Sequence, residues 1–438
     1  MNNFDIEKYK TIIDRAETMT VAGKVTKVIG TVVEGIVPGC TIGGLCDVFP
    51  HNNDTLIKAE VVGFKDDVVL LMPYGDMGGL RPGSTIYTKE VEQTLKVGEN
   101  LLGRVIDGLG NFIDGKEPAI LNDEHPLYRE AINPLYRPRI NKQISVGIRA
   151  IDGLLTLGKG QRVGIMAGSG VGKSILLGMI ARNTSADINV IGLIGERGRE
   201  VKEFLERDLG EEGLKRSVVV VVTSDRSPLI RVRGAYVATA IAEYFSRKGM
   251  DVLLLMDSIT RFATAQREIG LAIGEPPTTK GYTPSVFAKL PKLLERAGTN
   301  EVGGSVTAMY TVLVEGDDLT EPVSDAVRAI LDGHIVLSRD LATQNHYPAV
   351  DVLESKSRLM IEVVGEEHLN LAKRCMSLLA THKKAESLIN IGAYNKGSNP
   401  KIDESLKYID KINAFLEQDI YEKDTTEGSV EKLKAIFK

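Results

Sequence analysis

The stretch Val163–Ile180, VGIMAGSGVGKSILLGMI, decides the fold of this chain. It begins as an apolar strand, passes through the small residues AGSGV, and continues as a helix from GKS onward. A strand, a glycine-rich loop and a helix in this order are typical of a phosphate-binding loop. The usual pattern has glycine at its first position, where this chain has Ala167. Alanine fits that position wherever φ is negative, so the stretch still predicts a nucleotide site.

The residues of this loop suit separate tasks in holding a nucleotide. Gly168, Gly170 and Gly172 allow backbone N–H groups to face an anion, and the helix N-terminus adds partial positive charge. Lys173 would reach the β- and γ-phosphates of ATP, and the hydroxyl of Ser174 would bind Mg²⁺. The alternative is an incidental glycine-rich turn, which GKS at a helix start disfavours. The expected nucleotide-binding residues of the loop are Ala167, Gly168, Ser169, Gly170, Val171, Gly172, Lys173 and Ser174.

Two carboxylates stand at the ends of apolar strands farther along the chain. Asp257 ends DVLLLMD, and Glu196 follows INVIGLIG. Ligands bind at the carboxyl ends of parallel strands, so Asp257 suits Mg²⁺ and Glu196 suits activation of an attacking water. Arg197 and Arg199 follow closely enough in sequence to keep Glu196 charged. The alternatives are a helix cap for Asp257 and a structural ion pair with an arginine for Glu196.

The pattern of the chain changes along its length. Residues 1–18 have apolar residues at helical spacing, and residues 19–90 contain short β-branched runs separated by turn residues, which predict a small β-barrel. Residues 91–370 predict an α/β domain, because apolar strands alternate with helices, which indicates a parallel sheet covered on both faces. Within that range, the glycine- and proline-punctuated residues 91–150 predict linker and edge segments. Residues 371–438 contain helical patterns only.

Composition excludes some classes of function. The 438 residues include 54 Lys and Arg against 59 Asp and Glu, and the net charge of -5 gives no overall attraction to nucleic acid or anionic membranes. The charged N-terminus does not resemble a secretory signal, and no apolar run approaches the roughly 18 residues that span a bilayer. Cys40, Cys46 and Cys375 lack metal-ligand spacing and are expected to be buried free thiols. We therefore expect a cytoplasmic protein.

Several long motifs resemble a known family. These motifs are AGSGVGKS, IGERGREV, LLLMDSITRFATAQREIGLAIGEPPTTKGYTPSVFAKLPKLLERAG and HYPAVDVLESKSRLM. Together they resemble the bacterial type III protein-export ATPases, which drive flagellar and injectisome assembly and are related to the catalytic subunit of rotary ATP synthases. The resemblance covers about residues 20–420. It implies a RecA-like ATPase core between an N-terminal β-barrel and a C-terminal helical domain.

The resemblance also implies roles for individual residues. Glu196 is then the base that activates water, Asp257 organises Mg²⁺, and Tyr347 stacks on adenine. Arg358 matches the arginine finger that reaches the γ-phosphate bound by a neighbouring subunit. Taken alone, Tyr347 is more typical of packing beside Pro348, and Arg358 of a surface ion pair. The catalytic residues expected from sequence are Lys173, Glu196, Arg197, Asp257 and Arg358.

A finger supplied by the next subunit makes activity depend on assembly, so the resemblance implies a homohexamer with sites between subunits. It further implies an export stator protein, a central stalk protein, export-gate membrane proteins and chaperone–substrate complexes as partners, with peripheral contact to the membrane apparatus. The helix at 1–18 is the candidate for stator binding. The loop at 272–284 would face the ring centre and contact what passes or turns there, with a rigid surface connection as the equal alternative. The segments IGAYNKGSNP and INAFLEQD favour the flagellar branch.

Three alternative functions remain open. The first is the ATP synthase catalytic subunit itself, although its phosphate loop usually has the sequence GGAGVGKT and this chain has AGSGVGKS. The second is a ring-shaped nucleic-acid motor, which a barrel without clear basic character or stacking aromatics disfavours. The third is a ring subunit that binds ATP without hydrolysing it. The presence of both Lys173 and Glu196 argues against this last class.

Overall fold

The computed structural model describes residues 22–50, 56–89, 93–314, 316 and 318–438. These residues form two compact units, each with its own apolar core. The smaller unit holds the strands that precede residue 92 together with Leu271–Glu275. The larger unit holds Gln93–Gly270 and Pro276–Lys438. The helix predicted for residues 1–18 lies outside the described residues.

The smaller unit contains a closed barrel of six antiparallel strands, in the order β1-β2-β5-β4-β3-β6. Successive side chains of a strand point to opposite faces, so alternate apolar residues fill the interior. Val33, Leu71 and Ile86 are fully buried there, and the predicted β-barrel is confirmed. The strands are β1 (Ala22–Ile29), β2 (Val32–Ile36), β3 (Leu45–Phe49), β4 (Ile57–Lys65), β5 (Val68–Pro73) and β6 (Thr85–Lys89).

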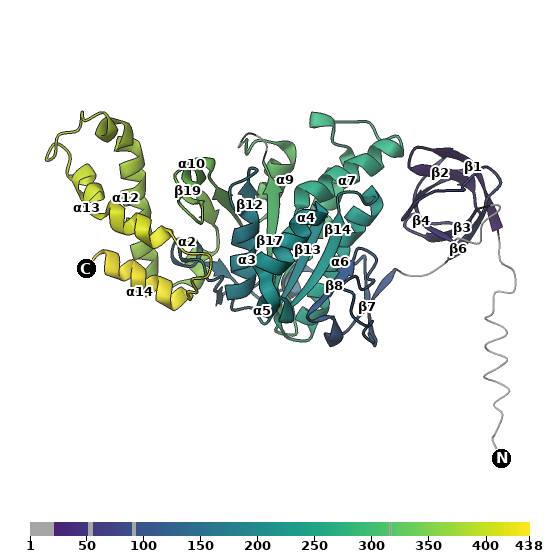
Figure 1. The fold of residues 1–438 in the computed structure, drawn as a ribbon, viewed down its shortest axis with the longest axis horizontal. Coiled ribbons are helices and arrows are strands. Elements are labelled where there is room, and N and C mark those ends of the chain that lie inside the picture. Colours follow the sequence, from purple (N-terminus) through teal and green to yellow (C-terminus); the bar gives the residue numbers. More distant parts are fainter. Residues whose placement is uncertain (1–21, 51–55, 90–92, 315, 317) are drawn as a thin grey trace, which may run out of the picture. The chain divides into compact units, whose positions relative to one another are not determined.

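The larger unit is built on a nine-stranded sheet in the order β19-β18-β12-β17-β15-β13-β14-β8, with β16 paired beside β17 (Figure 1). The strands from β18 to β8 run parallel, whereas β19 is antiparallel to β18 and β16 to β17. Most carboxyl ends therefore meet at one edge. The strands are β8 (Arg104–Asp107), β12 (Arg162–Ala167), β13 (Ile188–Glu196), β14 (Ser217–Thr223), β15 (Asp251–Asp257), β16 (Gly298–Thr299), β17 (Ser305–Leu313), β18 (Gly333–Leu337) and β19 (Val350–Ser357).

Helices cover both faces of this sheet, as the apolar runs of its strands require. Helix α6 (Pro228–Arg247) packs on β13, β14 and β15. Helix α3 (Lys173–Asn183) joins a core that contains Leu253 and Leu255, alternate residues of β15. The remaining elements of this region are β7 (Thr94–Val97), η1 (Glu99–Leu101), β9 (Asp123–Pro126), η2 (Pro134–Tyr136), β10 (Gln143–Ile144), α2 (Arg149–Leu154), β11 (Leu157–Gly158), α7 (Ile259–Ala272), η4 (Thr279–Gly281), α8 (Pro284–Leu294), α9 (Pro322–Ile330), α10 (Arg339–Thr343) and α11 (Met360–Val363).

The chain ends in three helices, drawn olive to yellow in Figure 1: α12 (Glu366–Asn390), α13 (Pro400–Leu416) and α14 (Thr426–Ile436). Helices α12 and α14 pack on α2. Within the larger unit, the C-terminal helices are therefore anchored to the part that contains the sheet, which we call the sheet unit. Ile412 and Leu433 are fully buried between the helices. The structure begins α12 at Glu366, a few residues before the helical region predicted from sequence.

Two segments of the larger unit can be compared with the sequence pattern. The helical segment after Glu196 is divided into α4 (Gly198–Glu203), a π-helical turn η3 (Phe204–Leu209) and α5 (Gly210–Lys215). Gly210 has a φ of 66°, a left-handed conformation that a continuous helix does not contain. The expectation of edge segments within residues 91–150 agrees with the structure, since Arg104–Asp107 forms β8, an edge strand of the main sheet.

Two of the three cysteines are buried as expected. All three cysteines are free, and Cys46 and Cys375 are buried. Cys40 is only partly buried, because it lies outside the strands of the barrel. In the part of the chain that the structure describes, no helix combines the length and the apolar character needed to cross a membrane.

Candidate nucleotide site

The phosphate loop joins β12 to α3 at the carboxyl edge of the sheet. Ala167 is the last residue of β12 and pairs with Leu313 and Leu337 on the neighbouring strands, so its backbone is extended. Gly170 and Gly172 have φ angles of 80° and 85°, a left-handed conformation that favours glycine. This geometry explains why alanine is accepted at the first position, whereas glycine is required later in the loop.

Lys173 brings the two predicted carboxylates together. It is the first residue of α3, and its Nζ forms an ion pair with Oδ1 of Asp257 at the end of β15. The same Nζ lies 3.7 Å from Oε1 of Glu196 at the end of β13. Ser174 is the next residue of α3 and is partly buried. Residues from three separate elements therefore meet at the mouth of the phosphate loop.

Burial and neighbouring charges set the protonation states in this cluster. Burial alone would lower the pKa of Lys173, but the carboxylates of Asp257 and Glu196 outweigh it and raise the pKa. The lysine therefore stays charged at neutral pH. Burial, together with repulsion from Asp257, raises the pKa of Glu196 to about 7, and Lys173 offsets this only in part. A carboxylate with such a pKa exchanges a proton readily near neutral pH, which suits a general base.

Two residues that shape the cluster were missed by sequence reasoning. Thr311 on β17 donates a hydrogen bond of 2.7 Å to Oδ1 of Asp257. Gly195, with a φ of 75°, forms a bulge in β13 directly before Glu196. A Cβ at Gly195 would lie 2.8 Å from Cβ of Arg261, so glycine is needed there for space as well. A hydroxyl near the end of an apolar strand could have marked Thr311, but the bulge leaves no sequence signal.

Tyr347 lies against the phosphate loop at Gly172. A Cβ placed on Gly172 would lie 3.4 Å from Cε1 of Tyr347, so the ring lies against the loop. The residue is 39% exposed, which leaves the ring accessible to a planar ligand. Nη1 of Arg339 lies 3.4 Å from the carbonyl oxygen of Ser169 in the same loop, and sequence reasoning did not select this arginine. Arg339 lines a cavity of about 240 Å³ at the ends of β12 and β18.

The structure places Arg197 away from the cluster. Its side chain is exposed and donates a hydrogen bond of 3.2 Å to Oε1 of Glu200, one turn along α4. Arg199 likewise pairs with Glu203. The expectation that these arginines hold Glu196 charged is therefore wrong for this structure, since the cation near Glu196 is Lys173. The physical reason is that α4 starts at once and turns both side chains outward.

Arg358 lies at the opposite edge of the sheet. Its backbone N–H donates to the carbonyl of Asp332, and the N–H of Asp332 donates to the carbonyl of Arg162 at the start of β12. A strand rises about 3.3 Å per residue, so Arg358 is roughly 16 Å from the loop end of β12, beyond the reach of its side chain. The side chain is exposed, with a long contact of 3.4 Å to the carbonyl of Arg328. Arg358 thus does not join the other site residues of its own chain.

The donor set fits a magnesium ion that also binds phosphate. Oε1 of Glu196 is buried and has no hydrogen-bond partner among the described atoms, so the cluster has an acceptor free for a water molecule. In proteins, Mg²⁺ usually binds one or two protein oxygens together with phosphates and waters. The hydroxyl of Ser174 and the carboxylate of Asp257 offer such oxygens. The described residues contain no group of three or more His, Cys, Asp or Glu that would hold a metal alone.

The fold and the site define a class of protein. A phosphate loop whose lysine meets two strand-end carboxylates, at the carboxyl edge of a parallel sheet, is the arrangement of a phosphate-loop nucleoside triphosphatase. Family models match three segments of the chain. The ATP synthase alpha/beta family matches with its beta-barrel domain at residues 25–89 and its nucleotide-binding domain at 147–357. The T3SS EscN ATPase C-terminal domain matches at 364–435.

Curated relatives resemble the chain over nearly its whole length. It is 53% identical over 421 residues to the flagellum-specific ATP synthase of Bacillus subtilis, covering 94% of both chains. It is 49% identical to that of Borreliella burgdorferi, covering 100% of both chains. It is also 49% identical to the type 3 secretion system ATPase of Xanthomonas euvesicatoria, covering 94% of this chain and 93% of the other. The chain therefore belongs to the ATP synthase alpha/beta family and, within it, to the flagellar and type III secretion ATPases.

Solved structures of a secretion ATPase have the same fold. The assembled ATPase EscN from enteropathogenic E. coli superposes with a TM-score of 0.90 and 46% identity, covering 95% of this chain and all of the other. EscN in complex with its central stalk EscO superposes with a TM-score of 0.88. The resemblance to the type III protein-export ATPases and the three-part fold inferred from sequence are confirmed.

Proposed function

We propose that this chain hydrolyses ATP with Mg²⁺ and uses the energy for protein export through a flagellar or type III secretion apparatus. The observation that carries the proposal is the contact of Lys173 with Asp257 and Glu196 at the phosphate loop. The similarity to flagellum-specific and type 3 secretion enzymes supports the use of that energy in export. The 53% identity to a flagellar relative favours the flagellar branch.

The site residues divide the chemistry among them. Lys173 and the backbone N–H groups after Gly168 bind the β- and γ-phosphates, and Ser174 and Asp257 hold the magnesium ion, which neutralises phosphate charge when bound. Glu196 orients the attacking water and accepts its proton. With its pKa raised to about 7, it can do so near neutral pH. Tyr347 holds the adenine ring against the loop.

Arg358 completes the site of a neighbouring copy in a ring of six. Its exposure and its distance from its own phosphate loop support action on the next subunit rather than on its own. A guanidinium placed on the γ-phosphate disperses the charge of the transition state and raises the rate by about 10³–10⁵. The assembled form of EscN supports a ring for this chain as well.

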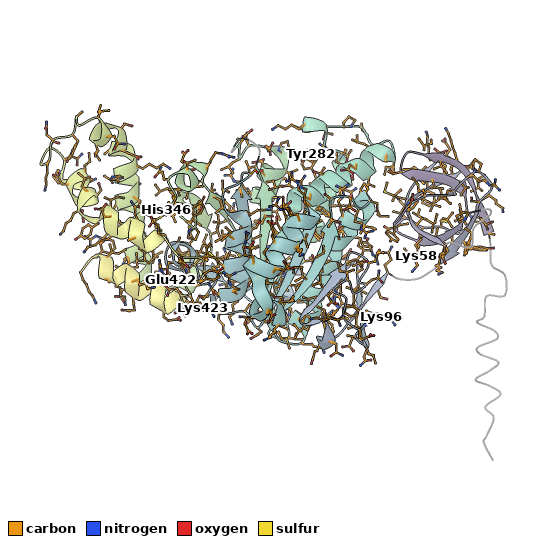
Figure 2. All side chains as sticks on the ribbon, in the orientation of Figure 1. Lys58, Lys96, Tyr282, His346, Glu422 and Lys423 are labelled. Atoms are coloured by element: carbon orange, nitrogen blue, oxygen red, sulfur yellow. The ribbon has the colours of Figure 1, made fainter. Side chains whose placement is uncertain are left out.

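The loop at 272–284 is our candidate for contact with a central stalk protein. It contains η4, and Nζ of Lys280 lies 3.4 Å from Oε1 of Glu321 in the segment that leads from β17 to α9. Tyr282, labelled in Figure 2, packs edge-on against Phe287. The complex of EscN with EscO supports a stalk as a partner.

Other partners follow from membership of the export family. We propose an export stator protein bound by residues 1–18, export-gate membrane proteins and chaperone–substrate complexes, with the chain in the cytoplasm and peripherally associated with the membrane apparatus. The division at 1–18, 19–90, 91–370 and 371–438 stays our proposal for the domain limits. An affinity pull-down from native cells would recover stator, stalk and chaperone proteins if this assignment holds, and synthase subunits if it does not.

The catalytic part of the proposal is tested with purified protein. The chain should release phosphate from ATP when Mg²⁺ is present and lose this activity when EDTA removes the ion. Lys173→Ala should abolish hydrolysis, because the phosphates lose their cation, while Lys202→Ala on exposed α4 should not. Hydrolysis that is independent of Mg²⁺, or that survives in Lys173→Ala, would contradict the proposed site.

A further inference from the structure

The turn between α13 and α14 is bound to the backbone of the proposed adenine-stacking residue. The N–H of Gln418 donates a hydrogen bond of 2.9 Å to the carbonyl oxygen of Tyr347. Gln418 comes just after the end of α13 and is 6% exposed, while Tyr347 precedes β19. The two residues are far apart in the sequence, so this contact forms only when the C-terminal helices pack on the sheet unit.

The side chain of Gln418 is fixed in this position by hydrogen bonds to the core. Its Oε1 accepts from the N–H of Arg149 at 2.8 Å, and its Nε2 donates to the carbonyl of Gly147 at 2.8 Å. Nε2 also lies 3.1 Å from the carbonyl of Glu422 in the same turn. A buried amide whose donor and acceptor are both bound to the backbone holds its own main chain in a defined place.

The surrounding contacts hold the turn to the same part of the core. The guanidinium of Arg149 donates to the carbonyls of Phe415, at 2.9 Å, and of Glu417, and it pairs with Glu422. Nδ1 of His346 lies 3.4 Å from Oε1 of Glu417. Figure 2 labels His346 on the side of the sheet unit that faces the yellow helices, with Glu422 on the same side. The backbone that carries Tyr347 is thus bordered by this turn.

We propose that Gln418 is a positioning residue for the nucleotide base. It holds the main chain of Tyr347 so that the ring lies over Gly172 and can stack on adenine. The inference rests on the proposed function and deepens it, because it concerns the base side of the same site. Gln418 forms hydrogen bonds to Tyr347, Arg149, Gly147 and Glu422, none of which is in the phosphate loop. Loss of Gln418 should therefore weaken recognition of the base and leave recognition of the phosphates intact.

The test compares two ligands that share phosphates and differ in the base. Binding of Mg·ATP and of Mg·tripolyphosphate is measured by calorimetry for the wild type and for Gln418→Met, which keeps the side-chain length and removes both amide hydrogen bonds. We expect the Kd for Mg·ATP to rise about tenfold, the scale of one aromatic–base stack, and the Kd for tripolyphosphate to change less than about twofold. Asn413→Ala, which removes an exposed amide from α13, is the matched control and should bind both ligands like the wild type.

Two other outcomes for a folded Gln418→Met variant would contradict the inference. Unchanged binding of both ligands would show that Gln418 does not position Tyr347. Equal weakening of both would show a general loosening of the site. If Gln418→Met does not fold, Gln418→Glu retains an oxygen that can accept from Arg149, and the same selective loss of ATP binding is expected. Failure of the wild type to bind Mg·ATP would instead overturn the proposed function, and the inference with it.

Discussion

Lys173 lies between two carboxylates, and this arrangement explains how a largely buried amine remains a cation. Its ion pair with Asp257 and its 3.7 Å approach to Glu196 outweigh the loss of solvation. At Glu196, burial and the charge of Asp257 raise the pKa to about 7, and Lys173 offsets this only in part. One residue of the cluster is thus held charged and another titrates near neutral pH, which suits the phosphate-binding and base roles proposed for them.

The base role of Glu196 gives a prediction at this scale. Glu196→Gln keeps the shape of the side chain but cannot accept a proton, so kcat should fall by about 10²–10⁴ while the Kd for Mg·ATP stays close to that of the wild type. Steady-state hydrolysis and calorimetry measure the two quantities. Glu203→Gln, an exposed carboxylate on neighbouring α4, is the control. A kcat that survives in Glu196→Gln would remove this residue from the chemistry.

Sequence could predict the residues whose position follows from local pattern. Lys173 and Ser174 follow from the loop motif, and Asp257 and Glu196 from their place at strand ends, where the structure finds all four. Thr311 was missed, because its contact with Asp257 depends on which strands are neighbours in the sheet. The direction of the Arg197 side chain could not be predicted from sequence either, since it depends on where α4 begins.

At the scale of elements, the order of strand, loop and helix was predictable because each apolar run is long and clearly bounded. Strands β12, β13, β14 and β15 and the barrel agree with the pattern. The division of the helix after Glu196 was not predictable, since the π-helical turn depends on packing against α3. The position of β8 in the sheet could not be predicted either, because a four-residue strand in a glycine-rich segment gives only a weak sequence signal for a strand.

Helix α12 provides a prediction about pH. His368, in its first turn, is buried, and its Nε2 lies 2.7 Å from the carbonyl of Gly153 on α2. Burial lowers the pKa of His368, and the charge of Lys434 on α14 adds to this, although the bond to Gly153 opposes it. The unfolded chain therefore binds this proton more readily, so the contribution of His368 to stability is present above about pH 6.5 and is lost as the pH falls below it.

The comparison of variants isolates this effect. Between pH 7.5 and pH 5.5 the unfolding temperature of His368→Gln should fall less than that of the wild type, and His382→Gln, farther along α12, should behave like the wild type. Thermal unfolding followed by circular dichroism gives these values. Burial raises the pKa of Asp152 on α2 to about 6, so this residue stabilises the fold as the pH falls, opposite to His368. The difference in unfolding temperature between the variants and the wild type is therefore the informative quantity. Equal pH dependence in His368→Gln and the wild type would contradict this account.

At the scale of the whole molecule, the parallel sheet separates two kinds of site residue. The phosphate loop, Glu196 and Asp257 lie at the carboxyl ends of the strands, and Arg358 lies beside Asp332 at the other edge. Under the proposed function, a single chain would carry most of one active site and the finger for another. Composition could not have indicated this separation of Arg358 from the other site residues, and the motif HYPAVDVLESKSRLM suggested it only through the family resemblance. The structure adds the physical reason: the length of a strand separates Arg358 from the phosphate loop of its own chain.

The most direct test of this account mixes two inactive variants. Arg358→Ala keeps the phosphate-loop cluster and lacks the finger, whereas Glu196→Gln keeps the finger and lacks the base. Each alone should bind Mg·ATP and hydrolyse it poorly. Mixed in equal amounts and allowed to exchange subunits, they should recover about a quarter of the wild-type rate, since about half of the sites carry Glu196 and about half of those face an intact Arg358. A mixture no more active than the separate variants would show that Arg358 does not complete the site of a neighbouring subunit.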